Sequence, residues 1–286
     1  MMPTGSEAPG RDGGGDFVEI DWRGRPVTIE CGWVGSADPA APLLVFLHEG
    51  LGSVAAWKDF PQRLCGAAGC RGLMYSRPGY GRSTPRAPGE TWASDFMHRQ
   101  AHEVLPALLA ALAIDAAVRP PWLVGHSDGG SIALLYAARH PRALAGAIVL
   151  APHIVVEPVS LASIEQARIA YAQTDLRERL ARYHADPDSA FHGWNRAWLD
   201  PAFAHWSIEA ELDAITCPLL AIQGVDDEYG TLEQIRGIAR RVAGTRLLEL
   251  ERCGHSPQRD RPEAVIAAAV AFLREARPAA DGLTRG

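Results

Sequence analysis

A serine between two glycines carries the strongest chemical signal in the sequence. Ser127 is the centre of Gly-His-Ser-Asp-Gly at 125–129, after an apolar run at 122–124 and before a segment with helical spacing at 131–139. A tight turn between strand and helix exposes such a serine, and the flanking glycines let the backbone pass close to its neighbours. We predict that Ser127 is a nucleophile. The amide of Asp128 then begins the helix, where unpaired donors and the helix dipole stabilise an oxyanion.

A serine hydroxyl needs a base within hydrogen-bond reach and a carboxylate that orients the base. His255 follows the strand-like run 246–250 and precedes the last helical segment, which suits a general base. Asp226 and Asp227 both follow the run 219–222, so either could orient the histidine. The sequence therefore predicts that three strand ends converge on one site.

The other histidines are less suited to the role of base. His126 lies inside the serine turn, which indicates packing or support of the site, and His48 follows a strand and is expected to brace the next loop. We expect surface or core positions for four histidines in a region without strands: His153, His184, His192 and His205.

A second oxyanion donor is offered by the loop after residues 43–47. This loop reads His48-Glu-Gly-Leu-Gly-Ser, and its glycines would let the backbone turn toward the serine. The Gly50 amide could then join that of Asp128, a contribution of about 2.7 to 4 kcal/mol per donor. The same residues would also form a simple glycine-rich turn, and the sequence leaves both interpretations open.

Strand-like and helix-like segments alternate around these residues. The pattern predicts an antiparallel hairpin at 17–33 and then a mostly parallel sheet covered by helices on both faces, an α/β fold whose ligands bind beyond the carboxyl ends of the strands. The expected further strands are 43–47, 72–75, 122–124, 147–150, 219–222 and 246–250, and the expected helices are 96–112, 131–139, 232–242 and 264–274.

The region 152–213 interrupts this alternation, because it shows helical segments and no strand. We predict a helical insertion between core segments 17–151 and 214–277, with loose tails at 1–16 and 278–286. Most aromatic residues of the insertion are expected to fill its own core. The candidates for lining a substrate pocket are Glu49, Trp57, Trp194, Trp198, Trp206 and Tyr229.

Composition excludes several functional classes. The 286 residues are 47% hydrophobic with a net charge of −6 and no basic block, which argues against nucleic acid or an anionic membrane as a partner. No signal peptide or membrane span is evident. Five scattered cysteines predict reduced thiols and a cytoplasmic location. No metal or organic cofactor is expected, the expected partner is a small-molecule substrate, and a homo-oligomer is compatible with the sequence.

Together these motifs resemble the α/β-hydrolase superfamily over nearly the whole chain, from about residue 17 to residue 274. In that family the residue after a His-Gly pair gives its amide to the oxyanion, which implies Gly50 here, although Glu49 replaces the usual glycine. We expect the Glu49 carboxylate to face away from the oxyanion or to take a hydrogen-bonding role. The family's acid follows a strand-ending glycine by three residues, which favours Asp227 over Asp226.

The resemblance also bears on the reaction. Residues 75–83 look like the family's D-x-P-G-x-G-x-S turn, with Ser76 in place of aspartate, and the insertion looks like the helical cap of many members. A serine at 127 argues against branches that use an aspartate nucleophile. The resemblance implies a serine hydrolase of small esters or related acyl compounds. The alternatives are a carbon–carbon bond hydrolase of the meta-cleavage type, a cofactor-free perhydrolase, and a non-catalytic protein that binds a small ligand.

Overall fold

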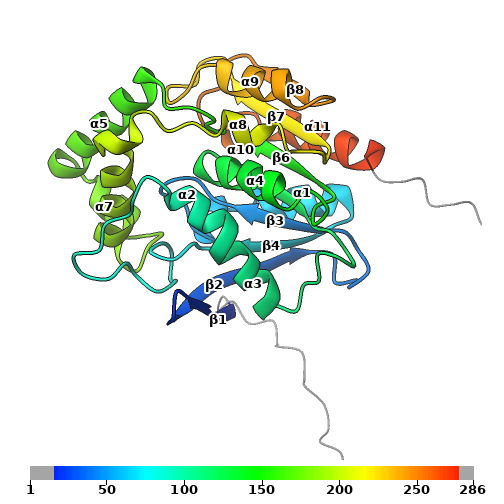
Figure 1. Ribbon diagram of the computed structural model, residues 1–286, viewed down its shortest axis with the longest axis horizontal. Helices are drawn as coiled ribbons and strands as arrows, with labels where there is room; N and C mark the ends of the chain where they lie inside the picture. The colour runs from blue at the N-terminus through cyan, green and yellow to red at the C-terminus, as the bar shows by residue number, and fades with distance from the viewer. Residues whose placement is uncertain (1–15, 277–286) are drawn as a thin grey trace, which may run out of the picture.

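The computed structural model describes residues 16–276 and contains one eight-stranded sheet (Figure 1). The strand order is β1-β2-β4-β3-β5-β6-β7-β8, and every neighbouring pair from β4 to β8 is parallel. The strands are β1 (Asp16–Trp22), β2 (Arg25–Gly35), β3 (Leu43–Leu47), β4 (Arg71–Tyr75), β5 (Trp122–His126), β6 (Gly146–Leu150), β7 (Leu219–Gly224) and β8 (Arg246–Leu250). The predicted α/β architecture with a mostly parallel sheet is confirmed.

The central strands form because their residues are apolar on both faces. Every residue of β5, β6 and β7 is buried, as the uninterrupted apolar runs predict. The last strand differs, because four of the five residues of β8 are exposed or half-buried. It lies at the edge of the sheet and has one neighbour only, so our expectation that it is buried on both faces is wrong.

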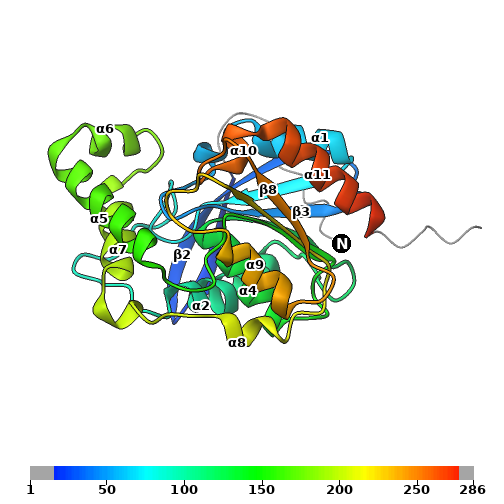
Figure 2. The same ribbon diagram turned by 90° about the horizontal axis from the view of Figure 1, so that it is seen from above.

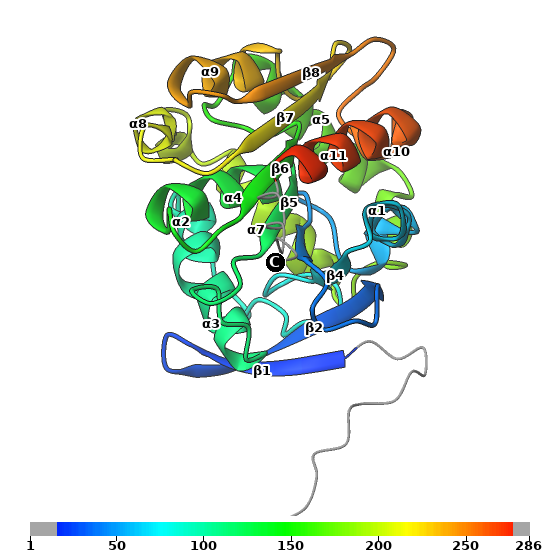
Figure 3. The same cartoon turned by 90° about the vertical axis from the view of Figure 1, so that its right-hand side faces the viewer.

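Helices cover both faces of the sheet, as Figure 3 shows. Helices α1, α10 and α11 lie on one side, and α2, α3, α4, α8 and α9 lie on the other. The helices of the core are α1 (Phe60–Ala68), α2 (Phe96–Arg99), the π-helical turn η2 (Gln100–Val104), α3 (Leu105–Ala111), α4 (Asp128–Arg139), α9 (Glu233–Arg241), α10 (Pro257–Asp260) and α11 (Pro262–Glu275), besides a 3-10 turn η1 (Ala55–Trp57). Two apolar clusters, one on each face, form the core.

The region between β6 and β7 is helical, and Figure 2 shows α5, α6 and α7 projecting to one side of the sheet. Its elements are α5 (Pro158–Gln173), α6 (Leu176–Leu180), α7 (Pro187–Trp198), η3 (Pro201–Phe203) and α8 (Glu209–Leu212). The boundaries of the insertion as a unit stay a prediction. The predicted tails lie outside the described residues, except that Asp16 is paired with Cys31 and begins β1.

Candidate active site

The turn around Ser127 joins β5 to α4 in a strained conformation. Ser127 has φ 53° and ψ −120°, a region that residues with a side chain rarely adopt. Gly125 and Gly129 must be glycines because other backbone atoms lie where a side chain would be. A methyl group on Gly125 would lie 2.2 Å from the carbonyl oxygen of Gly129, and one on Gly129 would lie 2.0 Å from that of Leu47. The motif therefore reflects close packing of the turn against β3.

His255 lies within hydrogen-bond distance of both Ser127 and Asp227. The Nε2 atom of His255 is 2.9 Å from Oγ of Ser127, and its Nδ1 atom is 2.8 Å from Oδ1 of Asp227. An Nδ1–H that donates to the carboxylate leaves Nε2 free to accept the serine proton. The structure thus brings together the three residues predicted from the sequence, each after the end of a different strand.

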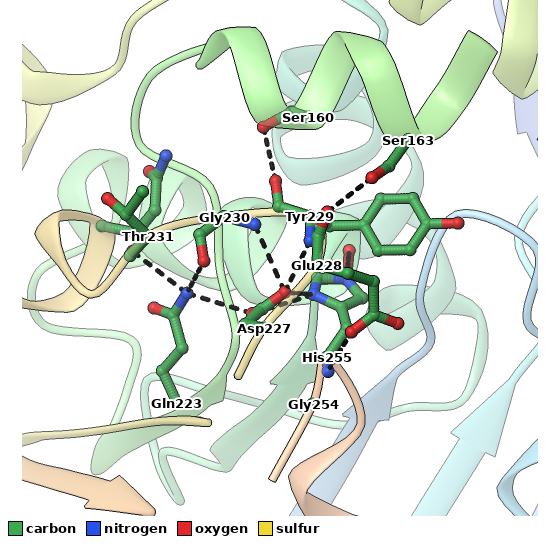
Figure 4. A network of polar contacts seen from close by, with 12 residues as sticks. Ser160, Ser163, Gln223, Asp227, Glu228, Tyr229, Gly230, Thr231, Gly254 and His255 are labelled. Carbon is green, nitrogen blue, oxygen red and sulfur yellow. Dashed lines mark hydrogen bonds and ion pairs between the residues drawn. The ribbon is translucent and has the colours of Figure 1, made fainter. Parts of the chain in front are cut away.

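Asp227 is held as an anion by its surroundings (Figure 4). Its Oδ1 atom accepts hydrogen bonds from the amides of Tyr229 and Gly230, and its Oδ2 atom accepts one from the Gln223 side chain. Burial alone would raise the pKa of this carboxyl, but the hydrogen bond and charge of His255 and the Tyr229 amide hold the pKa below its ordinary value of 3.8. A charged Asp227 can orient the ring and stabilise an imidazolium.

Asp226 takes no part in this arrangement. It is exposed, and its backbone amide donates to the carbonyl oxygen of Cys253. Of the two aspartates, Asp227 is therefore the one that contacts His255, and it is also the one that the family resemblance favours.

Helix α5 is tied to the loop that carries the acid, which the sequence did not predict. Ser160 donates to the carbonyl oxygen of Tyr229, and Ser163 donates to that of Glu228. The Glu228 carboxylate accepts from the backbone amide of His255 at 3.1 Å, and the Tyr229 ring lies 4.7 Å from the His255 ring (Figure 4). The insertion and both loops thus support the histidine together.

The two amides predicted as oxyanion donors belong to Asp128, at the start of α4, and to Gly50, in the loop after β3. Asp128 is the first residue of α4, so its N–H lies among the unpaired donors of that helix. Within residues 16–276 the Gly50 amide has no hydrogen-bond acceptor. The Trp194 indole packs directly on Gly50, because a methyl group there would lie 2.1 Å from Nε1 of the indole. A side chain at position 50 would collide with α7.

The Glu49 carboxylate lies beside the His126 ring. Its Oε2 atom lies 3.5 Å from Nδ1 of His126, and Nε2 of that ring donates to the carbonyl oxygen of His255 at 2.7 Å. Burial opposes ionisation of Glu49, but His126 holds the pKa of its carboxyl at about 2. Gln258 contacts the same ring at Nδ1. His126 therefore links the oxyanion loop to the backbone of the candidate base.

A buried ion pair lies behind the serine turn. Arg77 Nη1 is 3.7 Å from Oδ2 of Asp128, and both side chains are 1% exposed. Arg77 also donates to the carbonyl oxygen of Glu49, and the indole of Trp198 donates to Asp128. Burial raises the pKa of Asp128, while the charge of Arg77 opposes this rise. Arg77 thus joins the oxyanion loop to the turn that bears the nucleophile.

His153 lies close to His255, a position that was not predicted from the sequence. Its ring is 5.7 Å from that of His255 and 4.9 Å from that of Trp198. Burial, and then the nearby charge of His255, lower the pKa of His153 to about 3. The ring is therefore neutral near pH 7. His153 is the third residue after the end of β6, and this place beyond a strand end was the feature of the sequence that could have indicated a position near the site.

The six candidate pocket residues divide into two groups. The first group lies at the site: Glu49 contacts His126, and Trp194, Trp198 and Tyr229 contact Gly50, Asp128 and His255, respectively. Trp57 packs against Phe46 and Phe60 in the apolar core on the face covered by α1 and α11. Trp206 stacks on Phe203 within the core of the other face. In the described part of the chain, neither of these two rings contacts the triad.

Among residues 16–276, no group of three or more His, Cys, Asp or Glu side chains could hold a metal ion. No helix in this part of the chain is long and apolar enough to cross a membrane.

The fold and the serine turn define the class of the protein. The chain belongs to the alpha/beta hydrolase family, whose model matches residues 44–269. The resemblance inferred from the motifs is therefore confirmed at the level of the family.

Among curated proteins, the chain is similar to 2-succinyl-6-hydroxy-2,4-cyclohexadiene-1-carboxylate synthases. It is 25% identical to the protein of Salmonella agona over 270 residues, which cover 82% of this chain and 95% of that protein. It is 29% identical to the protein of an Enterobacter species over 203 residues, which cover 71% and 68% of the two chains.

Solved structures share the fold at lower identity. The enol-lactonase of Burkholderia xenovorans superimposes with a TM-score of 0.67 and 24% identity, covering 87% of this chain and 97% of that one. A thermophilic esterase of Thermogutta terrifontis superimposes with a TM-score of 0.68 and 20% identity, covering 92% and 100%. These likenesses concern the architecture alone.

Proposed function

We propose that the protein is a serine hydrolase that cleaves small esters or related acyl compounds. One observation carries the proposal: the line of hydrogen bonds from Ser127 through His255 to the buried carboxylate of Asp227. A serine, an imidazole and an ionised carboxylate in this order form an activated nucleophile. Esterase and lactonase structures with the same fold support this choice of substrate class.

In the proposed reaction, Oγ of Ser127 attacks the acyl carbon while Nε2 of His255 takes the hydroxyl proton. The amides of Gly50 and Asp128 stabilise the oxyanion of the tetrahedral intermediate. His255 then gives its proton to the leaving alcohol, and an acyl-enzyme remains. Water attacks this ester with the same base, which frees the acid and restores Ser127.

The similarity to the synthases supports a second candidate, a reaction that forms a carboxylate-bearing cyclohexadiene. The charges around the serine favour the ester instead. Glu49, in the loop that carries Gly50, has a carboxylate that His126 keeps ionised, and the buried Arg77 guanidinium is already bound to Asp128 and the Glu49 carbonyl. A substrate with several carboxylates would meet like charge there. Carbon–carbon bond hydrolysis, perhydrolysis and ligand binding without catalysis are the further alternatives.

The test combines a substrate series with covalent labelling. Purified protein and Ser127→Ala are assayed on p-nitrophenyl esters from acetate to long acyl chains, treated with a fluorophosphonate and measured by intact mass. We expect turnover of short esters and one label, both absent in the variant. The synthase substrate and a meta-cleavage product are assayed beside them. If the protein turns over the synthase substrate or the meta-cleavage product but none of the esters, the ester-hydrolase proposal is wrong. If it turns over none of these compounds and takes no label, ligand binding without catalysis is favoured.

The cytoplasmic location remains a prediction from the scattered cysteines. Fractionation of cells that make the protein would test it, because a location outside the cytoplasm contradicts the expectation of reduced thiols.

A further inference from the structure

A cavity lies beside the β1–β2 hairpin, away from Ser127, His255 and Asp227. It has a volume of about 710 Å³, within the range typical of small-molecule sites. The β1–β2 hairpin, the segment 78–93 and the start of the π-helical turn η2 enclose it. Ser127, Asp227, His255 and Gly50 are not among its lining residues. The residues that carry the argument are Trp22, Arg25, Arg86, Trp92, Phe96 and Gln100.

The cavity holds an excess of positive charge in a chain whose net charge is −6. Arg25 and Arg86 have no carboxylate within 4.0 Å in the described part of the chain, whereas the other two lining arginines are paired with acids. Within residues 16–276 the Arg86 side chain donates only to the backbone carbonyls of Ser189 and Glu90. The carboxylate that lines the cavity, that of Glu90, accepts from the amide of Ala87. Two guanidinium groups are therefore available to an anion.

Flat aromatic surfaces form the walls next to these charges. Trp92 is half-buried and stacks on Phe96, with ring centroids 6.3 Å apart and planes at 16°. Trp22, also half-buried, is held by a hydrogen bond from its indole N–H to Glu103. Rings fixed in this way present planar apolar faces, which suit a planar ligand.

The Gln100 side chain is a further polar feature of the cavity wall, where a donor from a ligand or a water would be accommodated. Gln100 lines the cavity and is 5% exposed, and its Oε1 atom is buried without a hydrogen-bond partner among the described residues. A buried amide oxygen without a partner is costly, so such groups are rare unless a ligand or water meets them. Gln100 also begins the π-helical turn η2, a distortion that is frequent at functional sites.

We propose that this cavity binds a planar aromatic carboxylate. Its ring would lie against Trp22 and Trp92, and its carboxylate would bind Arg25 and Arg86. The proposal is independent of the chemistry at Ser127, because no residue of the triad takes part in it.

Calorimetric titration with 2-naphthoate, and with the neutral 2-naphthamide as its matched analogue, tests the proposal. The protein is Ser127→Ala, so turnover does not interfere. We expect saturable binding of one naphthoate, which weakens at least about tenfold in Arg25→Gln and in Arg86→Gln because a charged hydrogen bond is lost. Naphthamide should bind as weakly as naphthoate binds to those variants.

The Arg25 side chain makes no hydrogen bond or ion pair in the described part of the chain, so Arg25→Gln should fold normally even if Arg86→Gln loosens its contact with Ser189. Arg182→Gln, at an exposed position outside the cavity, is the matched control and should bind naphthoate like its parent. Absence of saturable binding, equal affinity for the amide, or unchanged binding in Arg25→Gln would each overturn the proposal.

Discussion

Two adjacent aspartates, Asp226 and Asp227, lie in opposite environments, and this difference can be measured. In Asp227→Asn the amide would no longer hold Nδ1 of His255 protonated, so kcat for ester hydrolysis should fall by about 10³- to 10⁴-fold with little change in fold. Asp226→Asn alters an exposed side chain and should stay within about twofold of the parent. Circular dichroism verifies folding. A larger loss in Asp226→Asn than in Asp227→Asn would contradict the assignment.

His153 should make stability depend on pH. Its pKa is about 3 in the folded protein and 6.5 as an ordinary value, so between these pH values the unfolded chain binds a proton that the folded chain does not. The free energy of unfolding therefore falls as pH decreases from 6.5 toward 3, by up to about 1.4 kcal/mol per pH unit from this group. In His153→Phe this contribution should vanish.

Urea unfolding at a series of pH values measures that slope. His205→Phe, a change at an exposed histidine, should keep the slope of the parent, and His153→Gln serves as the second variant if phenylalanine disturbs the packing on Trp198. Equal slopes for the parent and both His153 variants would show that the ring is not held neutral by burial.

Site residues could be predicted from the sequence where they lie in an unusual local pattern. Ser127 has its glycines and His255 follows a strand, whereas Asp227 needed the comparison with a family to be chosen over its neighbour. His153 and Trp57 could not be placed in this way. Whether a ring packs near the triad or in the core of the opposite face depends on contacts between segments far apart in the sequence.

Among the elements, the turn between β5 and α4 should tolerate no side chain at Gly129. A methyl group there would meet the backbone of Leu47 at 2.0 Å, and backbone cannot move aside like the end of a side chain. Gly129→Ala should therefore lower the free energy of unfolding by about 2 kcal/mol or more and abolish ester hydrolysis.

Gly66→Ala is the matched control for this substitution. Gly66 lies in α1, and a methyl group there has no atom within 4 Å. Alanine is favoured over glycine in a helix by about 0.8 to 1.0 kcal/mol, so this variant should be slightly more stable and fully active. Thermal unfolding compares the two. A Gly129→Ala protein as stable and active as the parent would refute the packing argument.

Elements with long apolar runs were predictable, and short or peripheral ones were not. The strands from β3 to β7 lie at or within one or two residues of their predicted positions, because burial on both faces demands uninterrupted apolar residues. Helix α1 was missed, since its sequence carries a proline at its second residue and a glycine before its end. The exposure of β8 follows from its place at the edge of the sheet, which periodicity does not reveal.

In the whole molecule, hydrogen bonds from Ser160 and Ser163 connect the helical region between β6 and β7 to the loop that carries Asp227. Each hydrogen bond contributes about 0.5 to 1.5 kcal/mol, so the double variant Ser160→Ala and Ser163→Ala should let α5 open more readily. Amide hydrogen exchange should accelerate in α5 by about fivefold or more while β5 and β6 keep their protection.

Thr174→Ala is the control for that experiment, because its hydroxyl donates within the same helix, to Ala170, and not to the core. It should leave exchange in the body of α5 unchanged. Unaltered exchange in the double variant would mean that these two hydroxyls do not hold the insertion in place.

The order of the triad along the chain also has a consequence for synthesis of the protein. Ser127 and His255 are 128 residues apart, although their side chains are in contact. At about 5 to 20 residues per second, the ribosome adds the base roughly 6 to 26 s after the nucleophile. A nascent chain that already displays the serine therefore lacks its base, so the hydroxyl stays unactivated until the last strand and its histidine have emerged and docked.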